Sequence, residues 1–80
     1  MKLFARDPYR KITVARRVIV NLTDGETAIS GYVTDTTREL VVLRGAELLT
    51  EGAEPLSISG ETVIERTKIS FIQVPPGSKE

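Results

Sequence analysis

The sequence predicts an all-β domain, a small five-stranded and strongly bent antiparallel barrel with an N-terminal arm or short helix. Short segments that alternate apolar and polar residues follow one another over residues 17–74, with turn residues between them. An Asp24-Gly25 pair separates two of these segments and is a strong hairpin signal, because both central positions of the tight turn need positive φ. Glycines inside later segments, at Gly31 and Gly60, indicate the sharp bends that close a small barrel.

The N-terminal residues predict a short helix. Asp7-Pro8 is a favourable helix start, with Asp as the N-cap and Pro at the first helical position. The β-branched residues at 12–14 disfavour a long helix, so we expect about one turn over residues 9–14 that runs into an extended segment. The chain therefore divides into a basic arm or short helix at residues 1–16, a barrel at 17–75 and a flexible tail at 76–80.

Alternation of apolar residues defines the strands. In the first strand Val18, Val20 and Leu22 share one face, and in the second Ile29 and Val33 share a face. The expected strands are residues 17–23, 27–35, 40–43, 56–65 and 69–74.

The connections differ in length. We expect another bend at Gly45, after which Leu48 and Leu49 continue the pairing. The polar residues 50–55 should project as a loop, whereas residues 66–68 suit a tight 3₁₀ connection.

The last two strands are expected to contribute to the core. Phe71 is expected to be buried, on the same face as Ile69 and opposite Ile72 and Val74. The buried residues expected in the fourth strand are Ile58, Val63 and Ile64.

Two strands carry more apolar surface than one barrel interior can cover. Residues 40–43 and 69–74 are apolar on both faces, and a monomer rarely leaves such a patch exposed. We therefore expect another subunit to cover the second face by edge pairing or face packing. The alternative is that the N-terminal segment covers it within the same chain, through Leu3, Phe4, Ile12 and Val14.

Charge is unevenly distributed in a chain whose net charge is zero. Residues 1–17 carry a net charge of +5 and the remainder carries −5. Such an arm suits contact with phosphate or with an acidic partner surface. The alternative is that the arm folds back on its own acidic barrel or reaches a neighbouring copy.

The composition argues against catalysis. The chain has no cysteine and no histidine, which excludes disulfides, thiolate metal sites and the commonest general base. Its serines lack a base, its glutamates lack the spacing of a calcium loop, and its glycines are too scattered to cradle a phosphate. Asp24 is explained as a turn former by its neighbour Gly25. We expect no enzymatic activity, cofactor or metal.

Membrane association is not expected either. The apolar runs are too short to span a bilayer, and charges interrupt the segment where a signal peptide would need an apolar stretch. The sequence thus predicts a soluble, unprocessed chain with no membrane partner.

A nucleic-acid site would require basic residues interleaved with aromatic rings. In the barrel the basic residues stand among acidic ones, and Phe71 is expected in the core. The remaining combination lies in the arm, where Tyr9 stands beside Arg6, Arg10 and Lys11.

The segment from Val18 to Leu43 resembles the first motif of the Sm-like family, in which Val-x-Leu-x-Asp-Gly is followed by a glycine-bent second strand and a Leu-Val-Leu third strand. The kinked fourth strand, the short link at 66–68 and the fifth strand extend the resemblance to about residues 17–74. It implies a small barrel and a ring formed by edge pairing of the fourth and fifth strands. The residues that carry the first motif are Val20, Leu22, Asp24, Gly25, Gly31 and Leu40 to Leu43.

The chain departs from the family where RNA is bound. Sm-like RNA binders carry an Asp and an Asn at the turn between the second and third strands, whereas this turn holds Asp35 and Glu39 and no asparagine. Ser59-Gly60 stands in place of an Arg-Gly pair. An added carboxylate at this turn repels phosphate, so the resemblance does not extend to RNA binding there.

The whole chain, including KLFARDPYRK at the start and ERTKISFIQVPPG near the end, resembles small proteins of tailed phages that infect actinobacteria. This resemblance implies a component of the virion or of its assembly, present in the host cytoplasm during assembly and possible in the virion itself. In such particles many copies of a small barrel pack symmetrically.

The leading interpretation is a non-enzymatic, oligomeric phage structural or assembly protein that acts through contacts with itself or other virion proteins. One alternative is an Sm-like ring that binds nucleic acid through the basic arm. Another is a monomeric regulatory or anti-host module with one protein partner. The residues predicted to form protein interfaces are Leu3, Phe4, Arg6, Tyr9 and Arg10 in the arm, and Ile69, Phe71 and Ile72 in the last strand.

Overall fold

A computed structural model describes residues 8–77 of the chain. Within this part, no helix is long and apolar enough to cross a membrane. The elements, in chain order, are α1 (Pro8–Thr13), β1 (Arg17–Leu22), β2 (Ala28–Thr36), β3 (Leu40–Leu49), β4 (Leu56–Glu65), the 3₁₀ turn η2 (Arg66–Lys68) and β5 (Ile69–Gln73).

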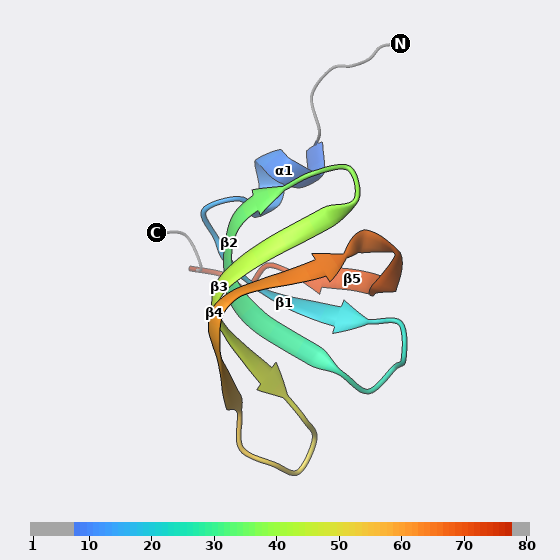
Figure 1. The fold of residues 1–80 in the computed structure, drawn as a ribbon, viewed down its shortest axis with the longest axis vertical. Helices are drawn as coiled ribbons and strands as arrows, with labels where there is room; N and C mark the ends of the chain where they lie inside the picture. The colour runs from blue at the N-terminus through green and yellow to red at the C-terminus, as the bar shows by residue number, and fades with distance from the viewer. Residues whose placement is uncertain (1–7, 78–80) are drawn as a thin grey trace.

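The strands form one antiparallel sheet in the order β4-β3-β2-β1-β5. Figure 1 shows β2 and β3 curving strongly, so that the sheet wraps around its own interior. The helix α1 lies at one end of the curved sheet, and the β3–β4 hairpin extends from the other. This arrangement confirms the predicted small, bent, five-stranded barrel with a short N-terminal helix.

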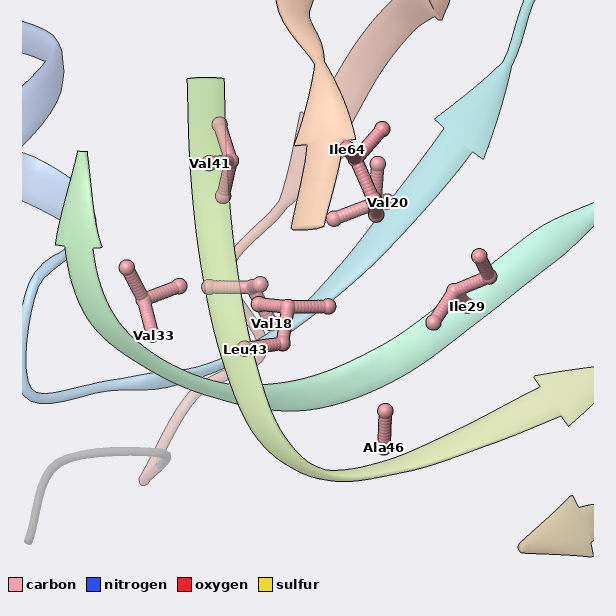
Figure 2. Packing of buried hydrophobic residues seen from close by; sticks show 8 residues of the cluster. All are labelled: Val18, Val20, Ile29, Val33, Val41, Leu43, Ala46 and Ile64. Carbon is pink, nitrogen blue, oxygen red and sulfur yellow. The ribbon is translucent and has the colours of Figure 1, made fainter. Parts of the chain in front are cut away.

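The core lies on the concave side of the sheet. Alternate residues of β1 and β2 are buried there, as the sequence pattern predicts. Figure 2 shows the buried side chains directed into the space that the strands enclose. They are Val18, Val20, Ile29, Val33, Val41, Leu43, Ala46 and Ile64.

The segment between α1 and β1 is fixed to the sheet by backbone hydrogen bonds. The N–H of Ala15 donates to the carbonyl of Val33 over 2.9 Å, and the N–H of Val33 donates to the carbonyl of Arg16 over 2.9 Å. Val14 packs against the core, whereas Ile12 is 54% exposed. The described part of the arm therefore lies against its own sheet, and Val14 but not Ile12 covers apolar surface there.

The third strand is longer than predicted. The expected bend at Gly45 is present as a local register shift inside a continuous strand, and Gly45 adopts a φ of 57° there. Across the shift, Arg44 pairs with Glu61 and Ala46 pairs with Ile58. The extra residues at the shift bend the ladder without ending it. The predicted kink at Gly60 lies in this same irregular stretch, since Gly60 has a φ of 74°.

Two predictions of burial were wrong. Val63 is 56% exposed because it directly precedes the buried Ile64, and successive residues of a strand point to opposite faces. Phe71 is 55% exposed. A register shift between β1 and β5 lets both Ile69 and Ile72 pack on the core, which leaves Phe71 on the outer face.

Candidate functional site

The outermost strands of the sheet, β4 and β5, form one candidate site. Within residues 8–77, each pairs with a neighbour on one side only, β4 with β3 and β5 with β1. A free strand edge presents unpaired backbone N–H and C=O groups to any strand that approaches. Large apolar side chains are exposed on both strands: Leu56 (63%) and Val63 (56%) on β4, and Phe71 (55%) on β5.

The predicted interface residues of β5 separate into two groups. Phe71 lies on the outer face, where a partner can reach it. Ile69 and Ile72 are half-buried and pack against the core of their own subunit. Of the predicted arm residues, Leu3, Phe4 and Arg6 lie outside the described residues, as do the side chains of Tyr9 and Arg10 in α1.

The turn between β2 and β3 contacts the link between β4 and β5. The N–H of Arg66 donates to the carbonyl of Glu39 over 2.8 Å, and the Thr37 hydroxyl accepts the N–H groups of Glu39 and Leu40 at 3.1 and 3.0 Å. A hollow of about 310 Å³ lies beside this contact. Its walls carry charges of both signs and are formed by Arg38, Glu39, Leu40, Glu65, Arg66 and Thr67.

The first hairpin turn is built around Asp24. Its carboxylate accepts the hydroxyl of Thr27 and the backbone N–H groups of Glu26 and Thr27, the latter two at 2.8 Å each. These hydrogen bonds, that of the Thr27 hydroxyl first among them, hold the pKa of Asp24 below its ordinary value. The carboxylate is thus engaged in shaping the turn, in agreement with its interpretation as a turn former. Among residues 8–77, no group of three or more acidic side chains is placed to hold a metal ion.

A third feature could not be identified from the sequence. The strand register places Arg17 opposite Tyr32, and Tyr32 opposite Arg44, so that two arginines flank a tyrosine across three neighbouring strands. Together with Gly45 they line an open hollow of about 420 Å³ on the outer face. We call this set the Arg-Tyr-Arg row. The residues are far apart in sequence, and only the register brings them together.

No protein-family model and no curated protein matches the sequence. Solved structures do match. A heptameric archaeal Sm protein aligns with a TM-score of 0.75 at 21% identity, over 88% of this chain and 100% of the Sm chain. The SmAP1 heptamer of P. aerophilum aligns with a TM-score of 0.75 at 23% identity, over 94% of this chain and 100% of that one.

The chain has an Sm-like fold. A chain in the structure of the NatC complex bound to CoA also aligns, with a TM-score of 0.72 at 15% identity, over 92% of this chain and 91% of that chain. The Sm-like fold is therefore found in different assemblies, so function must be argued from the surfaces of this chain. Two surfaces of this chain bear on its function. They are the free edges of β4 and β5 and the Arg-Tyr-Arg row.

Proposed function

We propose that this protein is a non-enzymatic assembly protein whose copies join head to tail, β4 of one subunit against β5 of the next. One observation carries the proposal. The two free edges lie at opposite ends of one sheet, and both strands expose large apolar side chains.

A contact between two unlike edges is heterologous, so every added subunit leaves one β4 and one β5 edge free until the assembly closes. Two solved structures with the same fold, those of the archaeal Sm protein and of SmAP1, are heptamers. Their assembly supports a closed ring for this chain.

The size of the domain also favours assembly. A chain of 80 residues buries a limited share of its surface, so its folded state gains from further burial. Phe71 and Val63 are each a little more than half exposed, so completing the burial of either side chain contributes about 1–2 kcal/mol, roughly half the value for a fully exposed one. Edge pairing would add this contribution while satisfying the backbone groups of both edges.

We further propose that the ring serves virion assembly in a tailed phage, in the host cytoplasm and as part of the particle. The resemblance of the whole chain to small phage proteins supports this setting. In the particle, Leu3, Phe4, Arg6, Tyr9 and Arg10 would contact a neighbouring virion protein. Mass spectrometry of purified virions tests the setting, since the protein should be found there in multiple copies.

The second candidate function is an Sm-like ring that binds nucleic acid through the basic arm. The net charge of +5 on residues 1–17 favours it. Salt separates the two candidates, because phosphate contacts lose affinity steeply as ionic strength rises whereas apolar contacts between subunits do not.

The test of the proposed assembly is the native mass of purified protein by light scattering, for the wild type and for the edge variants Val63→Ser and Phe71→Ser. We expect one closed oligomer for the wild type and smaller species for both variants, because each loses apolar contact at one side of every interface. Circular dichroism should show an intact sheet in all samples, since both side chains are more than half exposed.

Ile12→Ser is the matched control, because Ile12 is 54% exposed but belongs to α1 and to neither edge strand. Its native mass should equal that of the wild type. A monomeric wild type, or edge variants with the mass of the wild type, would overturn the proposal.

A further inference from the structure

We propose that the Arg-Tyr-Arg row is a nucleotide-binding platform on the outer face of the sheet, with the arginines holding a phosphate and Tyr32 stacking on the base. The row lies within a single subunit, so this inference is independent of the proposed assembly. The ligand class is a phosphate joined to a planar base, either as a free nucleotide or within a single strand of nucleic acid.

The geometry of the row brings the two guanidinium groups to the same strand. Arg17 projects from β1, yet its Nη2 atom lies 3.7 Å from the position that a Cβ on Gly45 of β3 would occupy. Its side chain therefore spans the width of β2, where Tyr32 is located, and ends beside the residue that follows Arg44. The absence of a side chain at Gly45 leaves this approach open.

The arginines of the row have carboxylates nearby but no direct ion pair. Among residues 8–77, neither Arg17 nor Arg44 forms an ion pair, although Glu61 lies opposite Arg44 in the register. Their guanidinium groups therefore remain available to an anion that binds at the row. The planar guanidinium fork matches phosphate oxygens through paired N–H donors.

The tyrosine adds a reason to favour a nucleotide over a simple anion. Tyr32 is half-buried, and the nearest side chains on its own face of β2 belong to the small residues Ser30 and Thr34. Aromatic rings on exposed strand faces bind bases by stacking, and basic side chains beside them bind the backbone phosphates. The hollow at the row is open and shallow, so a ligand lying across the face can reach the ring and both arginines.

The local charge also limits what can bind. Glu61 on β4 and Glu47 on β3 lie beside the row, where Glu47 pairs with Ser30 in the register. These carboxylates would repel the two phosphate backbones of a duplex passing over the sheet. The site therefore suits one nucleotide, or a single strand that crosses the face at the row.

The test is binding of a fluorescent single-stranded oligonucleotide of mixed sequence to the full chain, measured by anisotropy at several salt concentrations. Arg17→Gln and Arg44→Gln should each weaken binding and make its logarithmic salt slope shallower by about 1. Tyr32→Leu keeps an apolar side chain but removes the stacking ring, so we expect about tenfold weaker binding with an unchanged salt slope. Lys68→Gln removes the same charge from the exposed 3₁₀ turn η2, away from the row, and should leave binding unchanged.

Competition identifies the source of the ligand. Displacement of the oligonucleotide by a nucleoside monophosphate, but not by inorganic phosphate, indicates a free nucleotide, whereas displacement by unlabelled strand alone indicates nucleic acid. Native mass is measured for every variant, so that loss of assembly is distinguished from loss of binding.

Three results would overturn the proposal. The first is wild-type affinity in both arginine variants, and the second is an equal loss of affinity in Lys68→Gln. The third is displacement of the oligonucleotide by polyglutamate as effectively as by unlabelled strand, which would mean that the row recognises an acidic peptide.

Discussion

Gly31 shows how one residue determines the curvature of this sheet. A Cβ at this position would lie 3.2 Å from both Cβ and Cδ1 of Leu43 and 3.3 Å from the Cα of Ala46. The strands β2 and β3 therefore approach more closely than a side chain permits, and their register shifts at this point, between Ser30 and Tyr32. The sequence pattern predicted this role correctly, because a lone glycine between two buried residues of a strand has few other uses.

Gly31→Ala should lower the free energy of unfolding by about 1–3 kcal/mol, because the contacts at Leu43 and Ala46 must shift to admit the methyl group. Urea denaturation followed by circular dichroism measures the change. The neighbouring Ser30→Ala substitution, on the outer face, is the control and should change stability by less than about 0.5 kcal/mol. Equal effects of the two substitutions would show that the close approach of β3 does not restrict the size of the side chain at position 31.

The elements show why some features could be predicted and others could not. Strand positions followed from alternation and from turn residues, so β4 and the 3₁₀ turn η2 were predicted with their observed bounds. Two register shifts lie at Gly31 and Gly45, where glycines indicated bends, whereas the shift between β1 and β5 has no such local signal. The exposure of Phe71 follows from one such shift, and so does the continuity of β3 through Gly45.

The candidate sites, like the strands, could be predicted from the sequence only in part. Phe71 was predicted at an interface from the surplus of apolar faces in the last strand, and its exposure is consistent with that role. The Arg-Tyr-Arg row was missed because Arg17, Tyr32 and Arg44 belong to three strands, and only their pairing reveals them. From the sequence, a combination of basic residues with an aromatic ring was expected in the arm alone. The structure shows a second such combination, the Arg-Tyr-Arg row, on the sheet.

The junction between α1 and β1 contains an unfavourable backbone conformation. Ala15 has a φ of 67°, the left-handed region that glycine adopts most readily, and it directly precedes the bridge to β2. Ala15→Gly should raise the free energy of unfolding by up to about 1 kcal/mol, because it removes the clash of Cβ with the backbone. Thermal denaturation is the measurement.

Ala53→Gly is the control for this substitution. Ala53 lies in the exposed loop before β4 and does not have positive φ, so glycine there should lower stability by increasing the freedom of the unfolded chain. The account of Ala15 is contradicted when both substitutions lower the melting temperature alike.

At the scale of the whole molecule, the charge pattern separates two kinds of surface. The β3–β4 hairpin and its loop, residues 45–65, contain acidic residues and no basic ones. The described basic residues lie instead near α1, on the outer face and at the two turns. The exposed apolar residues of β4 and β5 lie outside the Arg-Tyr-Arg row. Assembly and ligand binding can therefore use different parts of the surface.

The central claim, pairing of β4 with β5 between subunits, is tested most directly by cross-linking two single-cysteine variants, Val63→Cys and Phe71→Cys. The chain has no cysteine of its own, so each variant carries one thiol. Each is treated with a short bifunctional thiol reagent, alone and after co-expression with the other. The head-to-tail account predicts covalent dimers in the co-expressed sample and none in either variant alone. Dimers within a single variant, or no cross-link in the co-expressed sample, would contradict it.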